Sequence, residues 1–192
     1  MEIVLIRHGR TPSNDARRYL GRSDEPLSAL GRAQAQTLYE SGLPPVDAVF
    51  SSPLKRCLET AAIVYPDQEP LIVPQFVELD FGRFEGRTHD QLTAEEPAYT
   101  AWLASNGEAD IPGGENRAEL CDRCRSGFLD MTARASGARR IATVAHSGVI
   151  MAVVSQFARP ARNFFDCFIQ NCQTVLCDWN GQFLTVKGGA LK

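Results

Sequence analysis

The chain has 192 residues and a formal net charge of −3, with 44% hydrophobic and 22% charged residues. This length suits one domain, or one domain with a lid-like segment, and it is long enough to bury a sizeable core. The acidic balance argues against a general nucleic-acid binder, and no apolar run is long enough to predict a membrane helix.

The first predicted element is a buried strand over residues 2–7, and it leads into Arg7-His8-Gly9. The strand starts so early that a signal peptide has no room, so we expect a cytoplasmic protein. Glycine lets the backbone approach a ligand, arginine suits phosphate oxygens, and a neutral histidine can act as a nucleophile. Five arginines against one aspartate in residues 7–22 also favour a small anionic ligand. A purely structural histidine is the alternative.

A helix at about 28–41 and a strand at about 46–51 follow, and then a helix at about 53–64. Ser52 is the expected N-cap of this last helix. Arg56 would then lie on its first turn, where a helix amino terminus and a guanidinium together form a natural phosphate seat. An ordinary solvated arginine is the alternative.

A short strand is predicted at about 70–73, followed by an irregular segment, 80–115, that could form a lid over the sheet edge. Glu78 lies among apolar residues, and burial would raise the pKa of its carboxyl group. A carboxylic acid of that kind suits protonation of a leaving alcohol. Asp80 and Glu85 are rival carboxyl groups in the same stretch.

The next predicted helix, at about 116–135, carries the only Cys-x-x-Cys pair of the chain. Such a pair is half a zinc site, but no second pair completes it. The two cysteines also share one helical face with three apolar residues, which predicts core packing with reduced thiols. The residues of this face are Cys121, Cys124, Phe128, Met131 and Ala135.

A strand at about 141–145 leads into His146 and a helix at about 147–158, and a strand at 174–178 pairs with 182–187 across an Asn-Gly turn. The alternation predicts an α/β fold over residues 1–192: a three-layer αβα sandwich with a mostly parallel central sheet. In such folds the carboxyl ends of the strands meet at one edge. The turns after three strands, including both histidine turns, should therefore converge there.

Five short motifs, distributed along the chain, are informative when they are taken together. They are Arg7-His8-Gly9-x-Thr11-x-x-Asn14, Gly21-Arg22-x-Asp24-x-Pro26-Leu27 with Gly31, Ser51-Ser52-Pro53-Leu54-x-Arg56, Glu78 with Gly82 and Glu85-Gly86, and His146 with Gly148. Together they resemble the histidine phosphatase superfamily, which includes phosphoglycerate mutases and small-molecule phosphatases. The resemblance implies a phosphoglycerate mutase-like fold that works without a metal or other cofactor.

By this resemblance His8 is the nucleophile that forms a phosphohistidine, and Glu78 is the proton donor. The residues implied to bind phosphate are Arg7, Asn14, Arg56 and His146. Gly21 and Ser147 are candidates for further contacts.

The short chain after His146 favours a phosphatase over a mutase, and residues 98–102 and 111–115 resemble the α-ribazole phosphatase branch. Tyr99 and Trp102 could stack on an aromatic leaving group, although packing against the sheet is the favoured role. The expected partner is a small phosphomonoester or inorganic phosphate, with no nucleic acid or membrane, and the protein should be a monomer or homodimer. Mutase-type transfer, a regulatory phosphatase acting on a phosphoprotein and a non-catalytic phospholigand-binding module are the alternatives.

Overall fold

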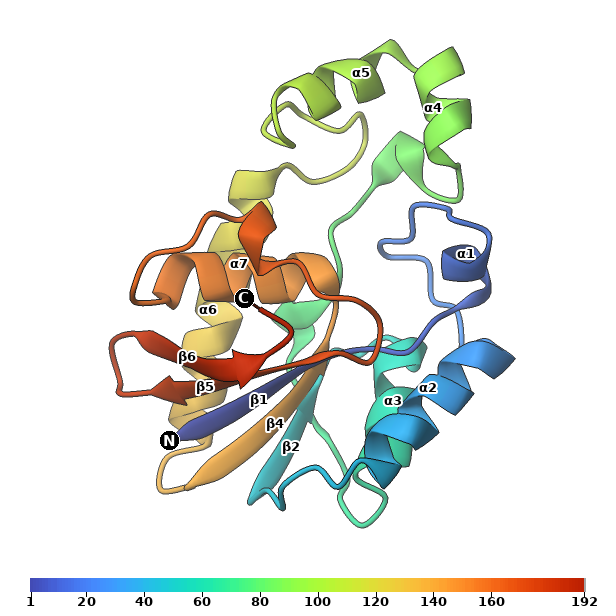
Figure 1. Cartoon of the computed structure of the whole chain (residues 1–192). Helices are drawn as coiled ribbons and strands as arrows, with labels where there is room; N and C mark the ends of the chain where they lie inside the picture. The colour runs from blue at the N-terminus through green and yellow to red at the C-terminus, as the bar shows by residue number, and fades with distance from the viewer. Residues whose placement is uncertain (192) are drawn as a thin grey trace.

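A six-stranded sheet forms the centre of the computed structural model, which describes residues 1–191 (Figure 1). Its strands run in the order β3-β2-β4-β1-β5-β6. The first four in this order are mutually parallel, and β5 and β6 are antiparallel to their neighbours. The predicted α/β fold with a mostly parallel sheet is confirmed. The strands are β1 (Glu2–Arg7), β2 (Ala48–Ser51), β3 (Leu71–Ile72), β4 (Arg140–Ala145), β5 (Thr174–Trp179) and β6 (Leu184–Gly189).

Helices cover both faces of the sheet: α2 and α3 lie on one side and α6 and α7 on the other (Figure 1). Among residues 1–191, no helix is long and apolar enough to span a membrane. The α-helices are α1 (Pro12–Asp15), α2 (Ala29–Glu40), α3 (Lys55–Val64), α4 (His89–Glu95), α5 (Pro97–Ala104), α6 (Arg117–Arg134) and α7 (Ser147–Phe157). Three short 3-10 helices are η1 (Pro74–Phe76), η2 (Gly82–Phe84) and η3 (Phe165–Cys167).

Strand β1 shows why the sheet needs cover on both sides. Successive side chains of a strand point to opposite faces, and all four central residues of β1 are buried. Ile3 and Leu5 belong to the core under α6 and α7, whereas Val4 and Ile6 belong to the core under α2 and α3. A continuous apolar run of this kind is typical of a strand buried on both faces.

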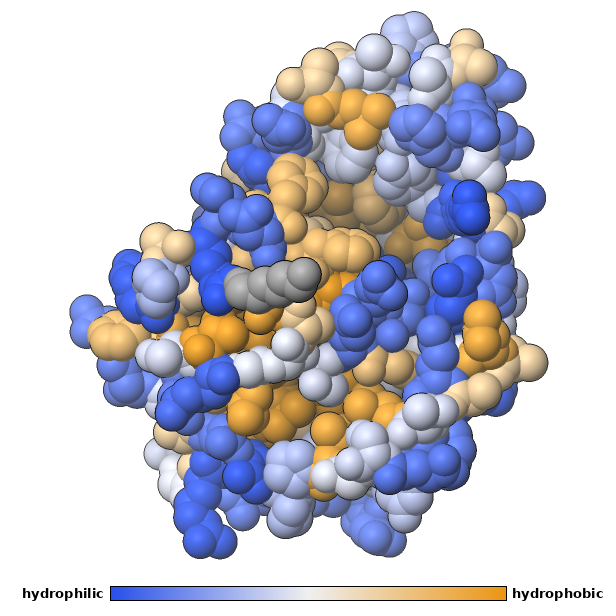
Figure 2. Space-filling view, in the orientation of Figure 1, coloured by the Kyte–Doolittle hydropathy of each residue, from blue (hydrophilic) through white to orange (hydrophobic). Residues whose placement is uncertain are grey.

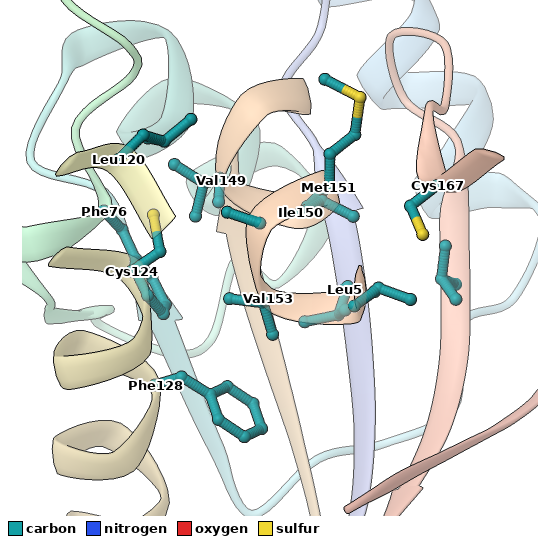
Figure 3. Packing of buried hydrophobic residues seen from close by; sticks show 14 of the residues in the cluster. Leu5, Phe76, Leu120, Cys124, Phe128, Val149, Ile150, Met151, Val153 and Cys167 are labelled. Carbon is teal, nitrogen blue, oxygen red and sulfur yellow. The ribbon is translucent and has the colours of Figure 1, made fainter. Parts of the chain in front are cut away.

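The predicted cysteine-bearing face of α6 packs in the core. Cys124, Phe128 and Met131 are fully buried there, while Cys121 is half-buried. Figure 3 shows Cys124 and Phe128 beside Val149 and Val153 of α7. Within residues 1–191 no group of His, Cys, Asp or Glu side chains is arranged to hold a metal ion.

The predicted strands and long helices are all present, with ends shifted by about two residues at most. The N-cap prediction for Ser52 is wrong, because α3 begins only at Lys55. The N–H of Lys55 is satisfied by the Asp24 carboxylate of another loop, at 2.7 Å. Ser52 is therefore free to contact His146, with 2.8 Å between the hydroxyl oxygen and Nε2.

The segment 80–115 is more regular than predicted, because it contains α4 and α5. These helices lie beyond the carboxyl edge of the sheet, where a lid was expected (Figure 1). Aromatic rings hold the segment to the loop after α1: Tyr19 contacts Tyr99 and Trp102. Tyr99 is fully buried, and its hydroxyl lies 2.7 Å from both Tyr19 and His89. Tyr99 is thus a packing residue, but the contacts of its ring are not with the sheet as predicted; they are with Tyr19, Phe84, His89 and Trp102.

Candidate active site

The two histidine turns lie side by side at the carboxyl edge of the sheet. Strands β1 and β4 are parallel neighbours with Arg7 opposite Ala145, so His8 and His146 leave the sheet at the same level. Their ring centroids are 5.1 Å apart in an edge-to-face arrangement. The expected convergence of these turns is therefore confirmed, and both rings are buried.

The His8 imidazole is held in one tautomer. Its Nδ1 lies 2.7 Å from the carbonyl oxygen of Gly9, and a carbonyl can only accept, so Nδ1 carries the proton. The other ring nitrogen, Nε2, then keeps its lone pair. Burial, reinforced by the positive charges of Arg56 and Arg7, holds the pKa of His8 well below its usual value. A neutral ring with an unprotonated Nε2 is the form that a nucleophile requires.

Arg56 is fully buried and links His146 to the loop before α2. Its Nη2 donates to the carbonyl of Gly21 at 2.6 Å, and its Nη1 donates to that of Ser23 at 2.8 Å. Its Nε lies 3.3 Å from His146 Nδ1. Because a guanidinium only donates, this Nδ1 accepts and the proton of His146 is on Nε2, facing Ser52. Gly21 thus supports Arg56 through its backbone.

Arg7 and Asn14 bring further polar groups to the site. Arg7 Nη1 donates to the carbonyl of Ile169 at 2.8 Å, and the guanidinium lies over the ring of Phe168. Its Nε is buried without a hydrogen-bond partner among residues 1–191. Asn14 is fixed by a capping box with Thr11 at the start of α1. An orphaned guanidinium N–H beside an amide is suited to bind an anion.

Of the three rival carboxyl groups, only Glu78 faces the cavity at this site. Its side chain accepts the N–H of Leu79 at 2.9 Å and that of Gly148 at 3.1 Å, and burial raises the pKa of its carboxyl group. Glu85 instead accepts the N–H groups of Gly21 and Arg22, and Asp80 pairs with Arg22 and accepts the N–H of Gly82. The structure thus brings Glu78 to the site and leaves its rivals outside.

The cavity has a volume of about 310 Å³ and lies between the α4–α5 segment and the sheet edge. Figure 2 shows this hollow, with apolar side chains exposed inside it. The other residues that line it are largely aromatic, and its polar wall consists of Arg7, Asn14, Arg18, Glu78, Arg117 and Ser147. The aromatic residues are Tyr19, Phe81, Trp102, Phe164, Phe165 and Phe168.

An ion pair between α6 and the loop before it fixes the backbone segment that carries Glu78. Arg123 donates two hydrogen bonds to the Glu115 carboxylate, at 2.8 and 2.6 Å. The same guanidinium reaches the carbonyls of Val77 and Glu78, at 2.8 and 3.5 Å. The N–H of Glu115 also donates to the carbonyl of Asp80. No sequence pattern predicts this pair, since nothing local connects residue 123 with residue 78.

We expect Glu115→Ala to lower the free energy of unfolding by about 3 kcal/mol, because it leaves the largely buried guanidinium of Arg123 without its carboxylate. Urea unfolding measures the loss. The control is Glu108→Ala, which breaks the exposed pair with Arg117 and should cost at most about 1 kcal/mol. Equal losses in the two variants would contradict the assigned role of Glu115.

The fold and this set of side chains define a phosphoryl-transfer enzyme: two buried histidines, two arginines and a carboxyl group at the carboxyl edge of an α/β sheet. Comparison of the sequence with models of protein families identifies one family. Residues 3–189 match the histidine phosphatase superfamily (branch 1), and the chain belongs to this superfamily. Its members act as phosphatases or mutases, and the fold is phosphoglycerate mutase-like.

Relatives with both kinds of name are similar to the chain. Phosphoglycerate mutase-like protein 4 of Arabidopsis thaliana is 32% identical, over 97% of this chain and 83% of the relative. A metal-independent phosphoserine phosphatase of the same plant is 35% identical, over 79% of this chain and 66% of the relative. The crystal structure of the α-ribazole phosphatase from Shigella flexneri superposes with a TM-score of 0.87 at 28% identity, covering 97% of this chain and 95% of that one.

Proposed function

We propose that the protein is a metal-independent phosphatase that hydrolyses a small phosphomonoester through a phosphohistidine on His8. The observation that carries this proposal is the state of His8: its proton is fixed on Nδ1 by Gly9, so that Nε2 is free beside two arginines and a second histidine. Phosphoryl transfer requires in-line placement and positive charge around the phosphoryl oxygens. Arg7 and Arg56 supply that charge.

The reaction has two steps. His8 Nε2 attacks phosphorus, the ester P–O bond breaks, and the Glu78 carboxylic acid gives its proton to the leaving oxygen. Water then attacks the phosphohistidine, Glu78 takes a proton from it, and the P–N bond breaks to release phosphate and restore His8. In both steps Asn14 binds phosphoryl oxygens together with the two arginines. His146 joins them by exchanging the contact of its Nε2–H with Ser52 for one with a phosphoryl oxygen.

The leaving group of the proposed substrate is aromatic or otherwise apolar. The cavity next to Glu78 is walled by Tyr19, Phe81 and Trp102, and a flat ring would bury apolar area against them. Trp102 is half-exposed in this wall, so it can stack on a ligand, whereas Tyr99 is fully buried. α-Ribazole 5′-phosphate has such a leaving group, and the similarity to the Shigella flexneri enzyme favours it.

A mutase-type transfer is the second candidate, since a relative of this chain is named for phosphoglycerate mutase. In a mutase, the phosphohistidine would be protected from water and passed back to the product. The aromatic residues of the cavity wall favour a bulky leaving group, whereas Arg18 and Arg117 in the same wall suit the charge of a phosphoglycerate.

A hydrolysis screen with EDTA present tests the proposal. We expect phosphate release from α-ribazole 5′-phosphate and p-nitrophenyl phosphate, with kcat/KM about tenfold or more above that for glycerol phosphate because of the apolar cavity. Conversion of 3-phosphoglycerate without phosphate release would establish the mutase instead. A phosphopeptide preferred over all small esters would indicate a regulatory phosphatase, and no release from any ester would indicate a binding module.

A further inference from the structure

Ser147 presents a buried hydroxyl group without a hydrogen-bond partner to the cavity. It is the first residue of α7, it is only 7% exposed, and its Oγ has no partner among residues 1–191. It lines the same cavity as Arg7, Asn14 and Glu78. Since most buried polar groups in native proteins are hydrogen-bonded, an unpaired hydroxyl in a cavity wall indicates a group that pairs with a ligand.

Half of the buried polar atoms without a partner among residues 1–191 belong to residues of the cavity wall. Four buried side-chain atoms of residues 1–191 lack a partner, and two of them, Arg7 Nε and Ser147 Oγ, belong to residues of the cavity wall. The other two belong to Tyr65 and Gln75, which do not line it. The charge of Arg7 suits it to bind a charged phosphoryl oxygen. The neutral hydroxyl of Ser147 can form a hydrogen bond with a neutral oxygen, such as that of an alcohol or of water.

The first turn of α7 lies directly against the Glu78 carboxyl group. The N–H of Gly148 donates to Glu78, and a methyl group at Gly148 would lie 2.3 Å from a carboxyl oxygen. Ser147 is the residue before this contact. The rings of His8 and His146 do not line the cavity; they belong to the turns that follow β1 and β4 at the edge of the sheet.

In-line transfer places the exchanging oxygen opposite the nucleophile. If His8 attacks from the sheet side, the leaving oxygen and later the attacking water occupy the cavity side. Among the polar residues of the cavity wall, Arg18 donates to the carbonyl of Gly86 and Arg117 pairs with Glu108. Glu78 and Ser147 carry no positive charge, and they are the carboxyl and hydroxyl groups that this wall offers to an oxygen. The leaving oxygen and the attacking water would thus both lie near the carboxyl group of Glu78 and the hydroxyl group of Ser147.

We propose that Ser147 is a further catalytic residue, whose hydroxyl holds the attacking water in the second step of the reaction. This inference rests on the proposed phosphohistidine mechanism. The water gives one proton to the Glu78 carboxylate and directs its other O–H to Ser147 Oγ. Its lone pair forms the new P–O bond while the P–N bond breaks and its electron pair returns to His8 Nε2.

Ser147 matters more for hydrolysis than for phosphorylation of the enzyme. The leaving alcohol is held by the remainder of the substrate, which packs against the aromatic walls of the cavity. A water molecule has no such anchor, and its position depends on the two polar groups alone. Loss of the hydroxyl should therefore slow the second step selectively and give competing alcohols an advantage over water.

Rapid-quench kinetics with p-nitrophenyl phosphate test this inference in Ser147→Ala and Ser147→Gly. We expect the burst of p-nitrophenol to persist at nearly the rate of the parent enzyme, while dephosphorylation slows about tenfold, as for the loss of one hydrogen bond. The acid-labile phosphohistidine should accumulate, and added glycerol should capture a larger share of the phosphoryl group. Ser147→Thr, which keeps a hydroxyl, should restore hydrolysis.

The matched control is Ser155→Ala in the same helix, whose hydroxyl bonds to the carbonyl of Ala152 and does not line the cavity. This variant should leave unchanged the rates of both steps and the division of the phosphoryl group between water and glycerol. The inference is overturned if Ser147→Ala changes neither step, or slows both equally. If the parent enzyme itself forms no phosphohistidine, the proposed function fails as well, and that result is distinct from a normal phosphohistidine with an unaltered partition.

Discussion

Replacing His8 by alanine is expected to reduce turnover to the background rate, a loss of about 10⁴-fold to 10⁶-fold. The variant removes the nitrogen that would attack phosphorus, and no other side chain at the site can replace it: His146 Nε2 carries a proton and faces Ser52. The acid-labile phosphoryl group should disappear too. Incubation with ³²P-labelled substrate, followed by alkaline electrophoresis, measures it independently of turnover.

The third histidine of the chain supplies the matched control. His89 lies in α4, away from the two histidine turns at the sheet edge, and its Nδ1 is 2.7 Å from the Tyr99 hydroxyl. His89→Ala should therefore retain the phosphohistidine. A labelled His8→Ala enzyme, or an unlabelled parent enzyme that still turns over, would show that His8 is not the nucleophile. Urea unfolding of both variants verifies that the buried site is intact.

The acidity dependence of the parent enzyme provides a related readout. A nucleophilic imidazole acts only when neutral, and burial with two nearby arginines lowers the pKa of His8. Protonation of His8 should therefore cost activity only when the pH falls through that lowered value, and not near the pKa of a free histidine. Activity falls toward low pH because the charged imidazolium is inactive, and the fall is shifted to lower pH because the site disfavours that charged form.

Local sequence patterns were sufficient to predict the strands, turns and helix that carry His8, His146 and Arg56. The apolar run before Arg7 and the one before His146 each predict a strand followed by a turn, and parallel pairing brings the two turns together. The same logic identified Arg56, because a helix after a strand must begin at that edge. These features depend on neighbours in the chain, so they can be read from single motifs.

Other features depend on contacts between distant segments, and the sequence did not reveal them. Ser52 fits a helix cap locally, yet Asp24 takes that role at Lys55 and Ser52 turns to His146. Arg123 of the Glu115–Arg123 pair donates to a backbone carbonyl 45 residues away in sequence. The helices α4 and α5 are short and packed largely by aromatic contacts, so periodicity alone does not predict them.

Burial acts in opposite directions on the two kinds of group at this site. It disfavours every charged form, so it lowers the pKa of His8 and of His146 and raises that of Glu78. A neutral imidazole and a protonated carboxyl group can thus coexist over one range of pH. A nucleophile and a proton donor are separated by their environments, as the two-step reaction requires.

Replacing Glu78 by glutamine is expected to slow turnover by about 10²-fold to 10⁴-fold, the usual contribution of a general acid. The amide keeps the size of the side chain and its oxygen can still accept the N–H of Gly148, but its N–H groups are not acidic enough to protonate a leaving oxygen. The loss should be largest for alkyl phosphates, whose alkoxide leaves poorly, and smaller for p-nitrophenyl phosphate, whose phenolate leaves without help. Steady-state kinetics on both esters measure the difference.

The pH dependence separates this role from a structural one. For alkyl phosphates, kcat/KM of the parent enzyme should fall as the pH rises through the raised pKa of Glu78, since the protonated form is the donor. Glu78→Gln should lack that fall. Glu85→Gln is the control, because that carboxylate holds backbone N–H groups outside the cavity. A crippled Glu85→Gln enzyme beside an active Glu78→Gln enzyme would transfer the acid role to Glu85, and equal losses on both esters would leave Glu78 a structural residue.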